Sequence, residues 1–358
     1  MKKNVWLLGM AVAALTSCTQ SEVVDIPESR VIDFETFVDK PTRASDDVID
    51  SESAKFREFY VYAAKGTKTT PEAAITFDSD LVLDQQLVEG GRGSWSYEPH
   101  ATWVSENYYR FAAYANGNVD GSSANQAKLD GKVAFKKGTT LGAQDWGLTF
   151  NDYQVAEGKD LVVAIADEKY TGSLATDPGS VALNFKHILS KVEFRFYYTP
   201  TVPDQYLEIE SFGFDAATTG DCETHYTGSE SLIGATWTPA IFTRNDEDGF
   251  DYTYFDGPDP DGKLPSGNIH EAHYVIPQPT TSLVVPKITI KTMNAEGEVQ
   301  SEQSFTNVSL AVTTPGHTSW LPGYVYRYEA TLSGKLHEIH FTTSVKNWDS
   351  TLPVLPVQ

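Results

Sequence analysis

The sequence predicts an all-β protein, and two observations support that fold class. Short runs of aromatic and β-branched residues recur at spacings of roughly 8 to 12 residues, with Gly, Pro, Asn and Asp between them. Few windows show the 3.6-residue period of an amphipathic helix. We therefore expect β-sandwiches, and 358 residues are enough for two of ordinary size.

Three runs in the first half are the clearest strands. Residues 58–64 and 108–114 are rich in Tyr, Phe and Val, residue types that favour strands. Asn116-Gly117 follows the second run and is a strong turn signal. Residues 160–166 form a continuous apolar run, which is typical of a strand buried on both faces.

The second half begins with a change of pattern. Residues 185–191 are expected to form a tight turn, and from residue 192 to 196 apolar and charged residues alternate, which predicts a strand with one buried face. We place a domain boundary here, giving sandwiches at 44–183 and 184–358. Further strands are expected at 207–214, 271–276, 283–291, 324–332 and 339–348.

The composition limits the classes of partner. A formal net charge of -22 repels phosphate backbones and anionic lipid headgroups, so nucleic acid is not an expected partner. Forty per cent hydrophobic residues exclude a disordered chain. Any attachment to a membrane must therefore come from a lipid anchor rather than from a basic patch.

The N-terminus carries the pattern of a bacterial lipoprotein signal. Lys2 and Lys3 precede an apolar run from Val5 to Leu15, and small residues lead to Cys18. The run is shorter than the roughly 20 residues that a membrane-spanning helix needs. We expect residues 1–17 to be removed and Cys18 to carry the lipid, which anchors the chain to the membrane.

A tethered strand is predicted within the propeptide, residues 18–43. In Val31 to Val38, the side chains of Ile32, Phe34 and Val38 fall on one face of a strand, whereas Asp33 and Glu35 fall on the other. A Pro-flanked basic site follows and ends at Arg43 and Ala44. Exposed tips of this kind are where proteases cut.

Other candidate sites were weighed against simpler structural roles. Cys222 has acidic neighbours, which disfavour a reactive thiolate, so we expect an inert cysteine. The paired histidines at 270 and 273 and at 337 and 340 lie on predicted strands, where residues three apart point to opposite faces and do not share a metal. Acidic loops at 245–249 and 256–263 are explained by turn chemistry rather than calcium.

Two further readings concern sugar binding and catalysis. Five aromatic residues could form a sugar-stacking platform, although core packing is the favoured interpretation: Trp95, Tyr97, Trp103, Tyr108 and Tyr109. No phosphate-binding loop, nucleophile elbow or catalytic triad pattern was found in the sequence. We expect neither a cofactor nor a metal, and we do not expect an enzyme.

Several segments in order along the chain resemble the fimbrillin family, the FimA- and Mfa-like type V pilus subunits of the Bacteroidales. These segments are the lipoprotein start, TRA near residue 43, DLVVA at 160–164, FKHILSKVEFRF at 185–196, LPGYVYRYEATL at 321–332 and VKNW at 345–348. The resemblance covers nearly the whole chain.

The resemblance implies two tandem transthyretin-like β-sandwiches, exported as a lipoprotein to the outer membrane and displayed on the surface. In that family a trypsin-like protease cuts after an arginine, here matched by Arg43, and removes the N-terminal strand. The vacated groove then accepts a strand from another pilus subunit, so Ile32, Phe34 and Val38 are the expected strand-exchange residues. The alternative is a monomeric surface lipoprotein that binds a glycan or a host protein.

Overall fold

The computed structural model describes residues 30–38, 56–70, 72–91, 94–118, 128–138, 145–156, 159–174, 176–199, 205–228, 233–240, 252–256, 269–312, 314–333 and 339–347. Their regular elements are β-strands arranged in four sheets, so the predicted all-β class is confirmed. Within these residues, no helix has the length and apolar character needed to cross a bilayer.

The largest sheet, sheet I, contains the N-terminal strand at one edge. Its order is β1 (Phe34–Val38), β11 (Val181–His187), β9 (Lys159–Ile165), β6 (Tyr108–Asn118), β2 (Glu58–Thr67), β4 (Leu83–Gly91) and β5 (Ser94–Ser96). The short strands β3 (Thr76–Phe77) and β10 (Lys169–Tyr170) pair with β2 and β6. As predicted for the apolar run at 160–166, β9 is buried on both faces.

Sheet II covers one face of sheet I. Its order is β15 (Ile233–Pro239), β14 (Thr219–Tyr226), β8 (Gly147–Gln154) and β7 (Val133–Lys136). Alternate residues of β14, such as Cys222 and Tyr226, point into a core shared with Tyr114 of β6 and Leu161 of β9. The other face of sheet I forms a separate core that includes Ile32 and Phe34.

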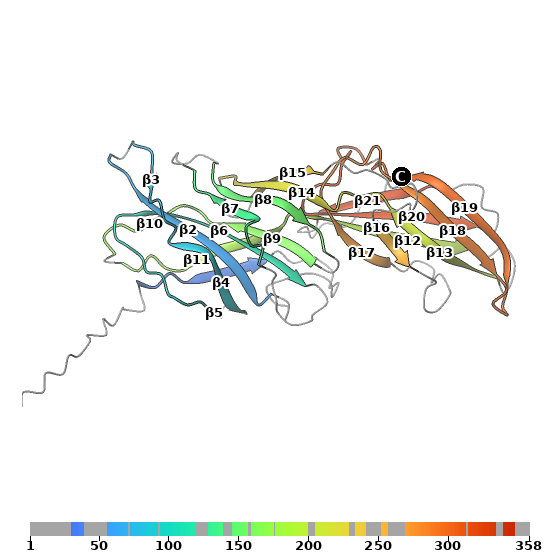
Figure 1. The fold of residues 1–358 in the computed structure, drawn as a ribbon, viewed down its shortest axis with the longest axis horizontal. Coiled ribbons are helices and arrows are strands. Elements are labelled where there is room, and N and C mark those ends of the chain that lie inside the picture. The colour runs from blue at the N-terminus through green and yellow to red at the C-terminus, as the bar shows by residue number, and fades with distance from the viewer. Residues whose placement is uncertain are drawn as a thin grey trace, which may run out of the picture.

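Sheets III and IV pack together at the other end of the elongated molecule (Figure 1). Sheet III has the order β17 (Ile269–Val275), β12 (Ser190–Thr199), β20 (Tyr324–Ser333) and β21 (Thr342–Asn347). Sheet IV has the order β16 (Tyr252–Asp256), β13 (Tyr206–Phe214), β18 (Val284–Met293) and β19 (Val299–Ser309). As predicted for 192–196, Val192, Phe194 and Phe196 point into their common core. The other face was expected to be exposed, but Glu193 is buried there because it forms an ion pair with Arg327.

Strand pairing divides the chain differently from the proposed boundary between residues 183 and 184. That boundary falls inside β11, which pairs with β9 and β1. The hairpin of β14 and β15, placed in the second sandwich by sequence, pairs with β8 of sheet II. A division by sheets would therefore begin the second unit after β11 and assign this hairpin to the first.

The expected tight turn at 185–191 is much shorter in the structure. β11 continues through His187 and β12 begins at Ser190, so only Ile188 and Leu189 connect the two strands. Both of these side chains are buried in the core between sheets I and II, together with Ile276 and Val325 from the second half. The two pairs of sheets are therefore joined by packed apolar side chains.

Candidate strand-exchange site

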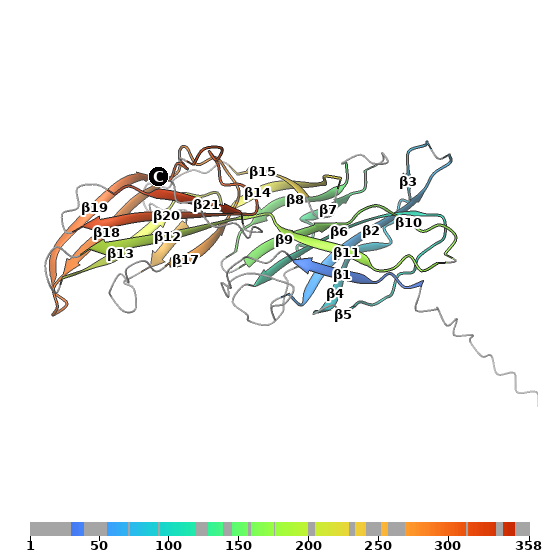
Figure 2. The ribbon, with the colours of Figure 1, turned by 180° about the vertical axis from the view of Figure 1, so that it is seen from behind.

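The N-terminal strand is a built-in part of sheet I. β1 pairs in parallel with β11, from Phe34 opposite Val181 to Val38 opposite Phe185 (Figure 2). The described part of sheet I has no strand beyond β1, so β1 forms its edge. Parallel pairing needs a long connection between the two strands. Here the other strands of sheet I lie between β1 and β11 in the sequence.

Alternation along this segment separates a buried face from an exposed one. Ile32 is 0% exposed, Phe34 is 5% exposed and Thr36 is also buried, whereas Asp33 and Glu35 are exposed. The Phe34 ring centroid lies 5.8 Å from that of Phe59, 5.7 Å from Tyr97 and 6.2 Å from Phe111. The inward side chains therefore complete the core on this face of sheet I.

Residues just before β1 are held by a second stretch of chain. The Ile32 N–H donates to the Ala101 carbonyl at 3.0 Å, and the Trp103 N–H donates to the Arg30 carbonyl at 2.7 Å. The Tyr97 hydroxyl donates to the Ile32 carbonyl at 2.9 Å. Burial raises the pKa of Tyr97 to about 12, so this hydroxyl keeps its proton at neutral pH.

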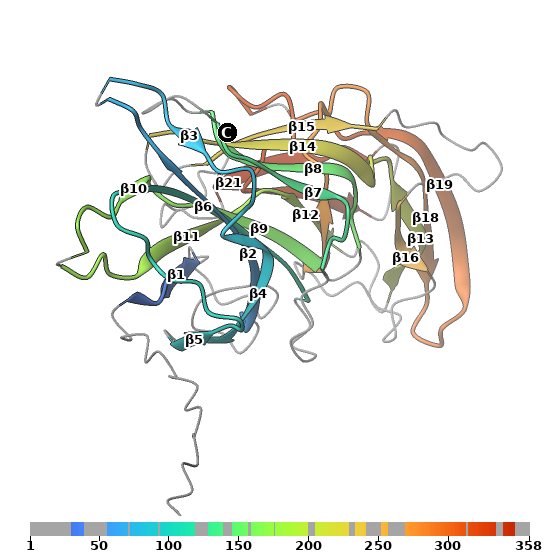
Figure 3. The same cartoon turned by 60° about the vertical axis from the view of Figure 1, so that its left-hand side comes forward.

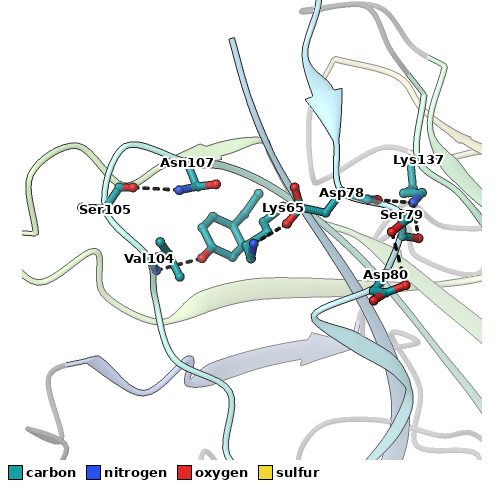
Figure 4. A network of polar contacts seen from close by, with 9 residues as sticks. Lys65, Asp78, Ser79, Asp80, Val104, Ser105, Asn107 and Lys137 are labelled. Carbon is teal, nitrogen blue, oxygen red and sulfur yellow. Dashed lines mark hydrogen bonds and ion pairs between the residues drawn. The ribbon is translucent and has the colours of Figure 1, made fainter.

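The loop that supplies these contacts is itself fixed to sheet I. The Val104 N–H donates to the Tyr109 hydroxyl at 2.8 Å, and the Asn107 side-chain amide donates to the Ser105 carbonyl at 2.7 Å (Figure 4). Nearby, Lys65 forms an ion pair with Asp78, as Figure 4 also shows. The bond to Tyr109 therefore holds this loop against β6.

We call the surroundings of β1 the strand site: the edge of β11, residues 101–103, and the rings of Phe59, Tyr97 and Phe111. Removal of β1 would expose the main-chain groups of β11 and the three rings together. Unpaired main-chain groups at a sheet edge accept another strand. The site is therefore suited to binding an extended segment that alternates apolar and polar side chains.

The structure describes the side chains of only some of the predicted site residues. Ile32 and Phe34 lie in the strand site. Val38 is opposite Phe185 in the β1–β11 ladder, and the structure does not describe its side chain. Cys18, Arg43 and Ala44 lie outside the described residues, so lipidation and cleavage remain predictions.

Sequence reasoning missed the partners of the tethered strand. Phe59, Phe111 and residues 101–103 gave no sign of contact with a segment so far away in the chain. Of the predicted aromatic platform, Tyr97, Trp103 and Tyr109 are buried, and Trp95 and Tyr108 are half-buried. The aromatic-rich stretch at 95–109 was the available signal, and the favoured interpretation as core packing is confirmed for Tyr97, Trp103 and Tyr109.

Of the remaining candidate groups, the structure describes the surroundings of Cys222 and His273. Cys222 is buried, and burial, with the Glu223 charge as a smaller cause, raises the pKa of its thiol. His273 is buried, and burial lowers its pKa to about 4. Among the described residues, no group of three or more His, Cys, Asp and Glu side chains is placed to hold a metal. Residues 245–249, 257–263 and His337 lie outside those residues.

Comparison with protein families gives one match over most of the chain. Residues 42–348 match a family model described as fimbrillin-like. No curated protein matches the sequence. The β1 segment precedes the matched range, so the family match does not bear on it.

Several solved structures match the chain over most of its length. A fimbrial protein from Bacteroides vulgatus has a TM-score of 0.52 at 15% identity, over 89% of this chain and 99% of that one. A candidate cell adhesion protein from Bacteroides uniformis has a TM-score of 0.41 at 13% identity, covering 90% and 100%. The fimbrial anchor protein Mfa2 from Porphyromonas gingivalis has a TM-score of 0.29 at 10% identity, covering 87% and 96%. At such identities, the first likeness bears on the fold alone.

Proposed function

Because the chain belongs to the fimbrillin-like family, we propose that it is built into a cell-surface fimbria by strand exchange at the strand site. β1 occupies that site in the precursor. After cleavage at Arg43, a strand from a neighbouring subunit takes its place. The observation that carries the proposal is that Ile32 and Phe34, on a segment ahead of the predicted cleavage site, are buried in the core.

The contacts of β1 are suited to a strand that occupies the strand site until assembly. Burial of Ile32 and Phe34 contributes about 1.5–3 kcal/mol each. The hydrogen bonds of Ile32, Asp33 and Arg30 add about 0.5–1.5 kcal/mol each. A cleaved strand would therefore stay bound until another segment displaced it, which protects the site before assembly.

Export and anchoring complete the proposed route. The signal at residues 1–17 directs export, and the lipid on Cys18 anchors the precursor in the outer membrane. Cleavage after Arg43 separates the lipid and β1 from the two pairs of sheets. The subunit then belongs to the fimbria, with other pilus subunits as its partners and adhesion as its role.

The alternative, a monomeric lipoprotein that binds glycans or host proteins, has less support. Its predicted aromatic platform is largely part of the core: Tyr97, Trp103 and Tyr109 are buried. On that alternative, β1 would stay in place for the lifetime of the protein.

Limited trypsin treatment of the precursor, produced from residue 19, tests the proposal. We expect a preferred cut after Arg43, followed by polymers whose amount rises with protein concentration and which separate on heating. Arg43→Ala should prevent both the cut and the polymers. Arg30→Ala, which removes an exposed arginine at the other end of the strand, is the matched control and should prevent neither. Equal polymerisation of the Arg43→Ala chain after trypsin would exclude the proposed route.

A further inference from the structure

The edge strand β19 differs from the other sheet edges. Within the described residues it is the longest edge strand, with 11 residues from Val299 to Ser309. Nine of these residues are exposed, on both faces of the strand. Figure 3 shows β19 at the outer flank of sheet IV, where it pairs with β18 and with no other described strand.

Proteins usually protect such an edge, and the composition of β19 lacks the usual protective residues. Prolines, lysines and inward-pointing charges prevent sheet edges from pairing with other chains. β19 contains no proline, lysine or arginine, and Glu302 is its one charged residue. By contrast, the described edge strands of sheet II are short, with seven residues in β15 and four in β7.

The central part of β19 has the regular geometry that strand pairing requires. From Ser301 to Thr306, each residue lies opposite one residue of β18 without a shift of register. Gln303 and Thr306 are exposed in this stretch, and the half-buried Phe305 packs against the core. A regular strand with free main-chain groups on one side is a template for a further strand.

Charge identifies the partner that fits this edge. A net charge of -22 makes most contacts between two copies of the chain repulsive, whereas the β19 edge is nearly neutral. On β18, Lys291 lies opposite Glu302, and Lys287 lies opposite Thr306. Two copies paired antiparallel about Ser304 would place Glu302 of each opposite Thr306 of the other, in line with that copy's Lys287.

We propose that β19 is a self-association surface through which two copies pair edge to edge across a two-fold axis at Ser304. The two four-stranded sheets IV would form one continuous sheet, with both copies contributing the same residues. Each Glu302 then lies between Lys291 of its own sheet and the uncharged Thr306 of the other copy, with that copy's Lys287 one strand further along the row. This arrangement is favoured over a register that places the two Glu302 side chains opposite each other. Because the strand site is not involved, the pairing does not require cleavage at Arg43.

Sedimentation equilibrium of the uncleaved chain from residue 19 tests the pairing. We expect a reversible monomer–dimer equilibrium at concentrations up to about 1 mM, the range of weak complexes. Thr306→Glu places a second carboxylate opposite Glu302 at two symmetric positions and should raise the dissociation constant about tenfold. Thr236→Glu, on the edge strand β15, makes the same change of net charge at another exposed position and should leave it within about twofold.

Oxidative cross-linking provides a test that does not depend on affinity. Two cysteines at position 304 would lie within the Cα separation of about 4.4–6.8 Å that a disulfide allows. The Ser304→Cys chain should form a covalent dimer, and the Thr236→Cys chain should not; Cys222 is buried and unavailable. A chain that stays monomeric, or equal effects of the two glutamate variants on the dissociation constant, would overturn the proposal.

Discussion

Replacement of Phe34 by alanine should loosen β1 after cleavage. The ring is 5% exposed and contacts Phe59, Tyr97 and Phe111. Truncation of a buried phenylalanine costs about 3–5 kcal/mol. After cleavage, the segment that contains β1 is a separate peptide, so the lost free energy weakens its binding to the rest of the chain. The lower value of about 3 kcal/mol corresponds to a roughly 10²-fold weaker complex.

The assay measures how fast the cleaved segment leaves. Arg30→Ala chains from residue 19, with and without Phe34→Ala, are cut with trypsin after Arg43 and diluted. Mass spectrometry then follows the fraction of segment that stays with the rest of the chain. We expect about 10²-fold faster loss from the Phe34→Ala chain, because most effects of interface mutations are on the dissociation rate.

Glu35→Ala is the matched control in the same strand. Glu35 is exposed, so its truncation should change the binding free energy by no more than about 0.5 kcal/mol. Equal loss rates from the Phe34→Ala and Glu35→Ala chains would show that the Phe34 contacts do not hold β1, and the reasoning about the strand site would fail.

Three further predictions concern the rest of the molecule. The Cys222 thiol should resist alkylation in the folded protein and react after denaturation, because burial raises its pKa; rapid reaction in the folded state would contradict its position. Arg110 is fully buried and bonded to Glu168 at 2.8 Å, so Arg110→Ala should lower the free energy of unfolding by about 3–5 kcal/mol in urea titrations, and a loss below about 1 kcal/mol would refute this. Burial lowers the pKa of His273 to about 4, so the unfolded chain binds a proton between about pH 6.5 and 4 and the folded chain does not. As the pH falls through this window, the free energy of unfolding should therefore decrease by about 1.4 kcal/mol per pH unit because of this group. His273→Gln should remove that part of the pH dependence.

Local patterns predicted the strands whose side chains alternate or are uniformly apolar. The inward face of Ile32 and Phe34 follows from alternation alone, and the apolar composition of 160–166 predicted the doubly buried β9. β19 was not predicted, because both of its faces are exposed and no alternation of hydrophobic residues marks it. Strand patterns are thus visible in the sequence where burial differs between the faces, or where both are buried.

Strand partners depend on contacts between distant residues and could not be predicted. β14 and β15 follow β13 in the chain, yet β14 pairs with β8 of the first half. β12 pairs in parallel with β20, and Lys191 lies opposite Val325. Nothing in either strand's composition selects these neighbours over others of similar pattern. The contact of Tyr97 with Ile32 is hidden from sequence for the same reason.

Coupling between loss of β1 and polymer growth provides the most direct test of strand exchange. Mass spectrometry of polymers formed from the Arg43-cleaved chain measures how much of the segment ending at Arg43 remains per subunit. If a neighbour's strand replaces β1, one segment should be released for each contact formed between two subunits. The amount of released segment and the number of such contacts should therefore rise together. Polymers that retain one segment per subunit would show that the subunits join by another surface.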